Sequence, residues 1–164
     1  MTKKQFVVLT LLFALLLPGS ATAISLGKKI NLFSGKDLNG NNIDMHDVVG
    51  NKPVMLIFWA SWCPNCKKEV PKINKLYEKY SGRGMDFIGI NVGFNDSESK
   101  ARAFINQTGM MYPVIFDKRG RISKQFSIQG VPTIIVTNRQ GIVRFKNYGL
   151  PTMTEKDFKE LLIN

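Results

Sequence analysis

Cys63 and Cys66 are the only cysteines in the 164-residue chain, and only two residues separate them. They follow the apolar run 54–58, which is short and β-rich and therefore predicts a buried strand. Apolar residues after Cys66 recur at helical spacing, so a helix is predicted to begin near Cys63. A helix N-terminus presents unpaired N–H groups and a partial positive charge, which favour a thiolate over a thiol. The thiolate is the nucleophile in disulfide exchange, so this position predicts a redox-active pair.

Two other roles for the cysteine pair, a structural disulfide and a zinc site, have less support from the sequence than a redox role. A purely structural disulfide would constrain little, because the loop that it closes is so short. A zinc site would need two more ligands, and the chain offers only His46 and no further cysteine. The sequence also lacks a nucleotide-binding motif. We therefore expect no metal and no cofactor other than the disulfide that Cys63 and Cys66 form.

Two segments resemble the thioredoxin superfamily. Residues 59–66, Trp-Ala-Ser-Trp-Cys-Pro-Asn-Cys, are similar to its active-site stretch, and Gly130-Val131-Pro132-Thr133 resembles the segment that carries its cis-proline. An X-Pro bond is the only peptide bond for which cis costs little, about 0.5–1 kcal/mol. The alternative is a trans proline that opens an edge strand. We expect Pro132 to be cis and close to the sulfurs, where its missing N–H leaves room for a substrate backbone.

The alternation of predicted strands and helices indicates an α/β fold. A final hairpin and helix imply a mixed central sheet with helices on both faces, and the resemblance makes this the thioredoxin fold. An N-terminal β-hairpin and an inserted helix–strand unit at 97–116 are additions that resemble the exported TlpA/ResA/DsbE-type reductases, which serve cytochrome c maturation. The likeness covers about residues 30–163. The predicted hairpin strands are 30–33 and 43–45, and the other elements are a strand at 54–59, a helix at 64–80, strands at 85–92 and 113–116, a short helix at 121–126, strands at 133–136 and 142–145, and a helix at 154–163.

The first 23 residues have the pattern of an export signal. Lys3 and Lys4 precede the apolar stretch 6–17, and Ala21-Thr22-Ala23 has the small-residue spacing of a cleavage site. The apolar stretch is shorter than the roughly 20 residues that span a membrane. We expect a signal peptide at 1–23, cleaved after Ala23, and a thioredoxin-like domain at 24–164 in the bacterial periplasm or on the outer face of the cytoplasmic membrane. The alternative is an uncleaved N-terminal anchor.

The chain is strongly basic, with 23 Lys and Arg against 12 Asp and Glu, a net charge of +11. Such a charge can attract acidic partners or an anionic membrane surface, or can simply be a solvated surface, which we favour. Nucleic acid is the less favoured partner, because the export signal argues against it and the basic residues are scattered along the sequence. We expect a monomer.

Cys63 and Cys66 have different expected roles. We expect Cys63, exposed at the helix start, to attack first, and the more buried Cys66 to resolve the mixed disulfide after losing its proton. Thioredoxin carries a buried aspartate six residues before its first cysteine, but Ile57 stands there. Glu69 lies one helical turn after Cys66, and the TlpA/ResA branch carries a glutamate at this offset. A buried carboxylate would have a raised pKa and could exchange protons near neutrality; the alternative is a solvated Glu69 beside the neighbouring lysines.

Substrate contacts are expected around Cys63. Trp62 precedes it and is predicted to form a surface platform, whereas Trp59 is predicted to be in the core. Pro64 and Asn65 lie between the cysteines, and Pro64 can occupy the first helical turn without loss of a hydrogen bond. The same surface includes Val131 and Pro132. His46 is interpreted as a surface or capping residue.

The sequence thus predicts an exported thiol-disulfide oxidoreductase that acts mainly as a reductant. Its expected substrate is a protein disulfide, in particular the heme-attachment cysteines of apocytochrome c, and its expected electron donor is a membrane thiol carrier. One alternative is an oxidant that donates its disulfide to folding proteins. Another is a non-catalytic adaptor that holds a cysteine-bearing protein. A peroxidase is disfavoured, because no threonine or serine stands three residues before Cys63.

Overall fold

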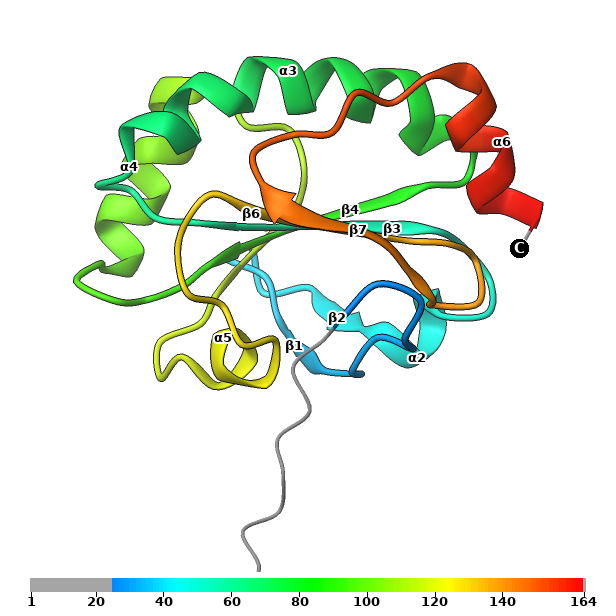
Figure 1. The fold of residues 1–164 in the computed structure, drawn as a ribbon. Helices are drawn as coiled ribbons and strands as arrows, with labels where there is room; N and C mark the ends of the chain where they lie inside the picture. Colours follow the sequence, from blue (N-terminus) through cyan, green and yellow to red (C-terminus); the bar gives the residue numbers. More distant parts are fainter. Residues whose placement is uncertain (1–24, 164) are drawn as a thin grey trace, which may run out of the picture.

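A five-stranded mixed sheet forms the centre of the protein in a computed structural model that describes residues 25–163. The strand order is β5-β4-β3-β6-β7 (Figure 1). Strands β5, β4 and β3 are parallel, whereas β6 pairs antiparallel with β3 and β7 pairs antiparallel with β6. The strands are β3 (Val54–Trp59), β4 (Asp86–Asn91), β5 (Val114–Phe116), β6 (Thr133–Thr137) and β7 (Val143–Tyr148).

Both faces of the sheet are covered, as the sequence predicts. Figure 1 shows α3, α4 and α6 on one face, and α2, α5 and the small β1–β2 sheet on the other. All six side chains of β3 are buried, and they alternate between the two apolar clusters that these layers enclose. The covering elements are β1 (Ser34–Lys36), β2 (Asn42–Asp44), α2 (Met45–Val48), α3 (Pro64–Tyr80), the 3-10 turn η1 (Ser81–Arg83), α4 (Glu98–Thr108), α5 (Arg121–Gln125) and α6 (Glu155–Ile163).

The N-terminal hairpin is confirmed, but its first strand is not where the sequence predicts it. That strand is β1, four residues later than the predicted 30–33. Ile30 and Phe33 are instead buried in the cluster beneath the sheet, so their apolar character reflects core packing rather than strand pairing. The carboxylate of Asp37 accepts the backbone N–H groups of Asn39 and Asn41, and this turn fixes the pairing of the strands on either side.

The inserted helix–strand unit and the C-terminal helix agree with the sequence prediction. Ser97 caps α4 through its side chain, and Gly109 ends that helix in the left-handed conformation that glycine adopts readily. At α6, the Thr154 hydroxyl accepts the N–H of Asp157, whose carboxylate accepts the N–H of Thr154 in return. Both helices lie on the same face of the sheet as α3 (Figure 1).

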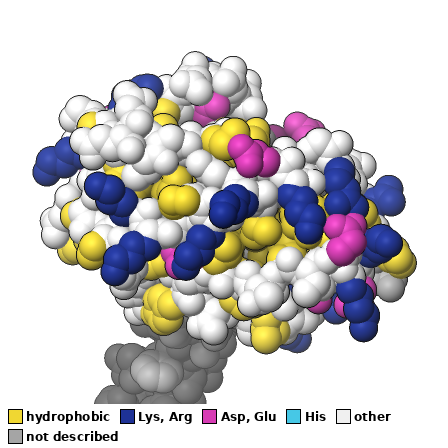
Figure 2. Space-filling view, turned by 90° about the horizontal axis from the view of Figure 1, so that it is seen from above, with side chains coloured by type: hydrophobic (Ala, Val, Ile, Leu, Met, Phe, Trp, Pro, Cys, Tyr) yellow, Lys and Arg dark blue, Asp and Glu magenta, His cyan; other side chains and the backbone are white. Residues whose placement is uncertain are grey.

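Basic side chains are distributed over the face that α3, α4 and α6 form. Figure 2 shows Lys and Arg spread across this face, with apolar patches between them and fewer acidic side chains. No helix within residues 25–163 is long and apolar enough to cross a membrane. The predicted signal segment 1–23 lies outside the described residues, so its cleavage stays a prediction.

Candidate active site

The cysteine pair lies where the central strand β3 leads into α3. Cys63 is the N-cap residue of α3, Cys66 lies in its first turn, and the two form a disulfide. The backbone N–H of Cys66 donates to Cys63 Sγ, with 3.1 Å between the two atoms. A hydrogen bond and the positive end of a helix both favour negative charge on a sulfur. The local structure therefore suits Cys63 to exist as a thiolate once the disulfide is reduced.

The prediction that Cys63 is exposed and Cys66 is more buried is wrong for the disulfide form. Their relative exposures are 4% and 3%. Cys63 belongs to the apolar cluster between α3 and the sheet, and its Sγ lies 3.6 Å from the carbonyl oxygen of Val131 in the loop before β6. Exposure therefore does not distinguish the two sulfurs.

The predicted cis peptide bond between Val131 and Pro132 is confirmed. Its loop is 68 residues further along the chain than Cys63, and the contact between Val131 and Cys63 brings the two segments together. The Thr133 hydroxyl donates to the Gly130 carbonyl at 2.6 Å, and the Gly149 N–H donates to the Pro132 carbonyl at 3.2 Å. Pro132 is buried, and Val131 is partly exposed beside the sulfur.

The residues predicted to contact substrate surround Cys63. Pro64 and Asn65 are exposed, and Trp62 has half of its surface accessible, at 50%. The indole Nε1 of Trp62 donates to the Phe94 carbonyl at 2.8 Å, so one edge of the ring is fastened while much of the ring remains open. Trp59 is buried in the core, as expected.

Glu69 is partly buried, as the sequence prediction requires. Its side chain is 16% exposed, and its Oε1 accepts from Lys72 Nζ at 3.0 Å. Its Oε2 is buried and has no hydrogen-bond partner among the described residues. Ile57 is also buried, on β3, and takes no part in proton chemistry. Glu69 thus has one oxygen held at the surface and one inside the protein with acceptor capacity to spare.

Asp96 holds the loop before Cys63 in place, and this role was not identified from the sequence. Its carboxylate accepts from the Ser61 N–H at 2.6 Å, the Ser61 hydroxyl at 2.7 Å, Asn91 Nδ2 at 2.8 Å and the Ser97 N–H at 2.8 Å. Burial opposes its ionisation, but the hydrogen bonds outweigh burial and hold the pKa of Asp96 below its usual value. The Asp96 carboxylate therefore ties the loop before Cys63 to the end of β4. The only sequence signal was an Asn-Asp-Ser segment before a helix, which is common at helix starts.

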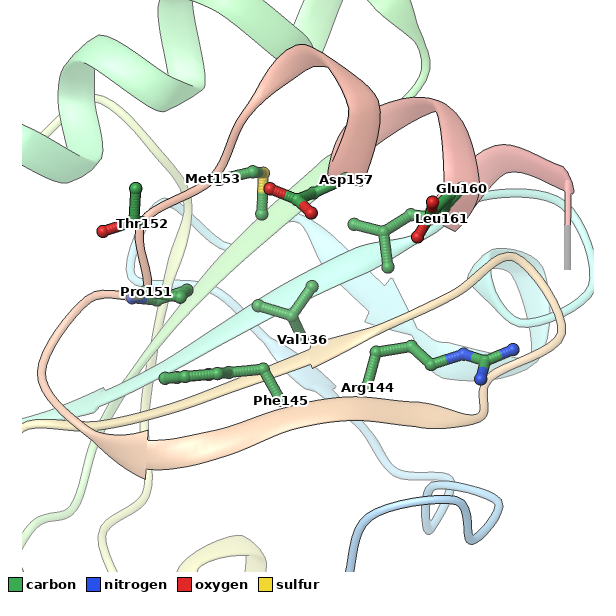
Figure 3. A pocket seen from close by; sticks show the side chains of 9 residues that line it. All are labelled: Val136, Arg144, Phe145, Pro151, Thr152, Met153, Asp157, Glu160 and Leu161. Atoms are coloured by element: carbon green, nitrogen blue, oxygen red, sulfur yellow. The ribbon is translucent and has the colours of Figure 1, made fainter.

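Two surface hollows differ in their relation to the cysteines. One, of about 800 Å³, is lined by residues of the loops after β4 and β5, by α5, by Trp62 and by Val131, which contacts Cys63. The other, of about 600 Å³, lies between β7 and α6 and contains no predicted site residue (Figure 3). Its floor is apolar, with Val136 and Phe145, and its rim carries both Arg144 and Glu160. Only the first hollow adjoins the thiol chemistry.

Within residues 25–163, no cluster of three or more His, Cys, Asp or Glu side chains could hold a metal ion. His46 is exposed, and its Nδ1 lies 2.8 Å from Asp44 Oδ1 at the start of α2. The two cysteine sulfurs are bonded to each other. This disulfide is itself a group that can take up two electrons and be reduced to a dithiol.

Comparisons with known proteins agree with this chemistry. Residues 26–146 match the model of the AhpC/TSA family. The thiol-disulfide oxidoreductase ResA of Halalkalibacterium halodurans is 31% identical over 137 residues, which are 83% of this chain and 76% of that protein. Among solved structures, a Chlorobium tepidum protein described as a thiol:disulfide interchange protein DsbE is 25% identical with a TM-score of 0.71, over 85% of this chain and 96% of that one. StoA of Bacillus subtilis is 26% identical with a TM-score of 0.66, over 80% and 96%.

Proposed function

The chain belongs to the AhpC/TSA family and is a thioredoxin-like thiol-disulfide oxidoreductase, similar to ResA, DsbE and StoA, and from this premise we propose that it is an exported reductant of protein disulfides. The observation that carries the proposal is the hydrogen bond from the Cys66 N–H to Cys63 Sγ at the start of α3. It supports Cys63 as the sulfur that becomes a nucleophilic thiolate.

The reaction proceeds in two thiol–disulfide exchanges. The Cys63 thiolate attacks one sulfur of the substrate disulfide, a mixed disulfide forms, and the other substrate sulfur leaves as a thiolate. Cys66 then loses its proton and attacks Cys63 Sγ, which releases the second substrate thiolate and leaves the Cys63–Cys66 disulfide. Two electrons pass to the substrate, and the disulfide form described here is the product state.

The surface around Cys63 is proposed to hold the substrate backbone. Pro132 has no N–H and therefore competes for no acceptor on the bound chain. Trp62, Pro64 and Asn65, next to Cys63 in the sequence, are exposed, and Val131 both contacts the Cys63 sulfur and lines the hollow of about 800 Å³.

Glu69 is proposed to take the proton from Cys66 during the second exchange. Its buried Oε2 has no other partner among the described residues, so it has a lone pair available for a proton. Lys72 holds the other oxygen at the surface, which fixes the orientation of the carboxylate. Because Ile57 occupies the place of the thioredoxin aspartate, Glu69 is our candidate for the proton acceptor at this stage.

The proposed substrate is the pair of heme-attachment cysteines in apocytochrome c, and the proposed electron donor is a membrane thiol carrier. Support comes from the sequence resemblance to exported reductases of cytochrome c maturation and from the export-signal pattern of residues 1–23. We propose that the protein works as a monomer and binds no nucleic acid.

Redox titration of the purified protein in dithiothreitol or glutathione buffers tests the direction of electron flow. Known thioredoxin-like proteins span about −270 to −120 mV. A reductant should lie near the negative end, and a potential near the positive end would instead identify an oxidant of folding proteins. Turnover of hydrogen peroxide would favour a peroxidase, and full function of a Cys63→Ser/Cys66→Ser double variant in cells would favour an adaptor.

A further inference from the structure

The hollow beside Cys63 has an apolar wall. Trp62 and Phe94 are both exposed, and the hydrogen bond from Trp62 Nε1 to the Phe94 carbonyl joins the loops that carry them. Val131, which lines the same hollow, touches Cys63 Sγ through its carbonyl oxygen. A polypeptide whose cysteine is joined to Cys63 can therefore continue directly along this wall.

Another part of the lining of this hollow is cationic. Lys118 and Arg119 lie between β5 and α5, and Lys124 lies on α5; all three are exposed. Within residues 25–163, none of their side chains forms an ion pair, and no Asp or Glu lines the hollow. We call this hollow, with its apolar and cationic walls, the basic groove.

Two nearby carboxylates leave the charge of the basic groove uncompensated. Asp117 is buried directly before Lys118, and its Oδ2 accepts the N–H and the hydroxyl of Ser123 at 2.7 and 2.8 Å. Asp96 follows the Phe94 loop, and its oxygens accept from Ser61, Asn91 and Ser97. Both carboxylates hold loops in place rather than pairing with the three cations.

We propose that the basic groove binds the polypeptide next to the substrate disulfide and selects substrates with Asp or Glu and an apolar side chain beside the reacting cysteine. Charge complementarity carries this step, because three unpaired cations beside an apolar wall match an acidic, partly apolar segment. An anionic membrane is a poorer match, because the site is a hollow and one of its lining residues, Val131, contacts Cys63. The inference rests on the proposed reduction of protein disulfides and names the class of protein substrate.

The test uses two disulfide-cyclised peptides of equal length, each with one Leu beside a cysteine. One carries three Asp or Glu residues next to that cysteine, and the other carries three Lys. We expect the reduced full-length protein to reduce the acidic peptide about tenfold faster at low salt, since three exposed ion pairs each contribute modestly. The preference should shrink in about 1 M salt, where the screening length falls to about 3 Å.

Charge variants locate the preference. The triple variant Lys118→Glu/Arg119→Glu/Lys124→Glu should reverse the preference, and the corresponding Gln variant should abolish it. Lys28→Glu/Lys36→Glu/Lys75→Glu is the control, because it changes the net charge equally at exposed sites outside the basic groove and should retain the preference. Denaturant unfolding checks that each variant is folded.

Binding separates this inference from the proposed function. Calorimetry on the oxidised protein, with peptides whose cysteines are serines, needs no electron transfer and should also favour the acidic peptide. Acid-selective binding without reduction would support the groove and contradict the proposed function. Equal rates and equal binding of both peptides would overturn the groove, and so would an equal loss of preference in the control variant. Unchanged peptide preference, with loss of binding to phosphatidylglycerol vesicles in the groove variant, would show a membrane-binding surface instead.

Discussion

Cys63 and Cys66 are equally shielded in the disulfide, yet their surroundings differ. Cys63 Sγ accepts a backbone N–H and lies against the carbonyl of Val131, a residue that also lines the basic groove. Cys66 belongs with Val70 and Ile73 to the apolar cluster between α3 and the sheet, and Cys63 belongs to the same cluster, so the hydrogen bond to Cys63 Sγ is what separates the two. The polar contacts of Cys63 Sγ, rather than its exposure, therefore support our proposal that Cys63 attacks and Cys66 resolves.

Replacement of each cysteine by serine tests this difference most strongly. Cys66→Ser should accumulate mixed disulfides with partner proteins, because Cys63 can still attack but nothing resolves the product. Cys63→Ser should accumulate none. Non-reducing electrophoresis of both variants after incubation with a disulfide substrate measures the outcome, and equal accumulation would remove the assignment.

Glu69→Gln tests the chemistry on the side of Cys66. This change keeps size and polarity but removes the proton acceptor, so resolution of the mixed disulfide should slow by about 100-fold. The first exchange, which Cys63 carries out, should be little affected. Stopped-flow measurement of the two steps separates them.

Glu78→Gln provides a matched control for Glu69→Gln, because Glu78 is an exposed glutamate on the same helix. It should resolve the mixed disulfide at the wild-type rate. If Glu69→Gln also resolved at that rate and left the thiol titration unchanged, Glu69 would be only a partner of Lys72.

Asp96→Ala tests the support on the side of Cys63. The variant removes a carboxylate that accepts from Ser61, Asn91 and Ser97, and leaves partly buried donors unpaired. We expect the free energy of unfolding to fall by about 1–3 kcal/mol. Urea denaturation measures the change, with Asp47→Ala, at an exposed position on α2, as a control within about 0.5 kcal/mol of wild type. Equal stability of the two variants would show that the Asp96 contacts stabilise little.

Features that depend on neighbouring residues could be predicted from the sequence, whereas features that depend on distant segments could not. Local patterns are sufficient to predict β3, α3 and the thiol pair, because apolar periodicity and the two-residue cysteine spacing are encoded in adjacent residues. The burial of Cys63 depends on Val131, 68 residues further along the chain. The role of Asp96 and the basic groove depend on loops that meet only in the folded chain. Local apolar content also misplaced β1, since Ile30 and Phe33 serve the core.

The pH dependence of the Asp96 contribution is the smallest predicted effect. Burial raises the pKa of Asp96, but the hydrogen bonds from Ser61, Asn91 and Ser97 lower it by a larger amount. The pKa of Asp96 in the folded protein is therefore below its usual value. The unfolded chain then binds more protons near pH 4, and stability must rise with pH through this range. The contribution is complete above the unfolded pKa of about 3.9 and is lost as pH falls through the folded value.

The difference in unfolding free energy between wild type and Asp96→Asn isolates this term, because other carboxylates with lowered pKa, such as Asp37 and Glu155, contribute to both proteins. Urea titrations between about pH 6 and pH 3 should show the difference shrink by less than about 1 kcal/mol, since solvent screens a partly exposed group. A difference that stays constant with pH would mean that neutral hydrogen bonds hold the loop before Cys63 equally well, and that the charge of Asp96 adds nothing on this side of the disulfide.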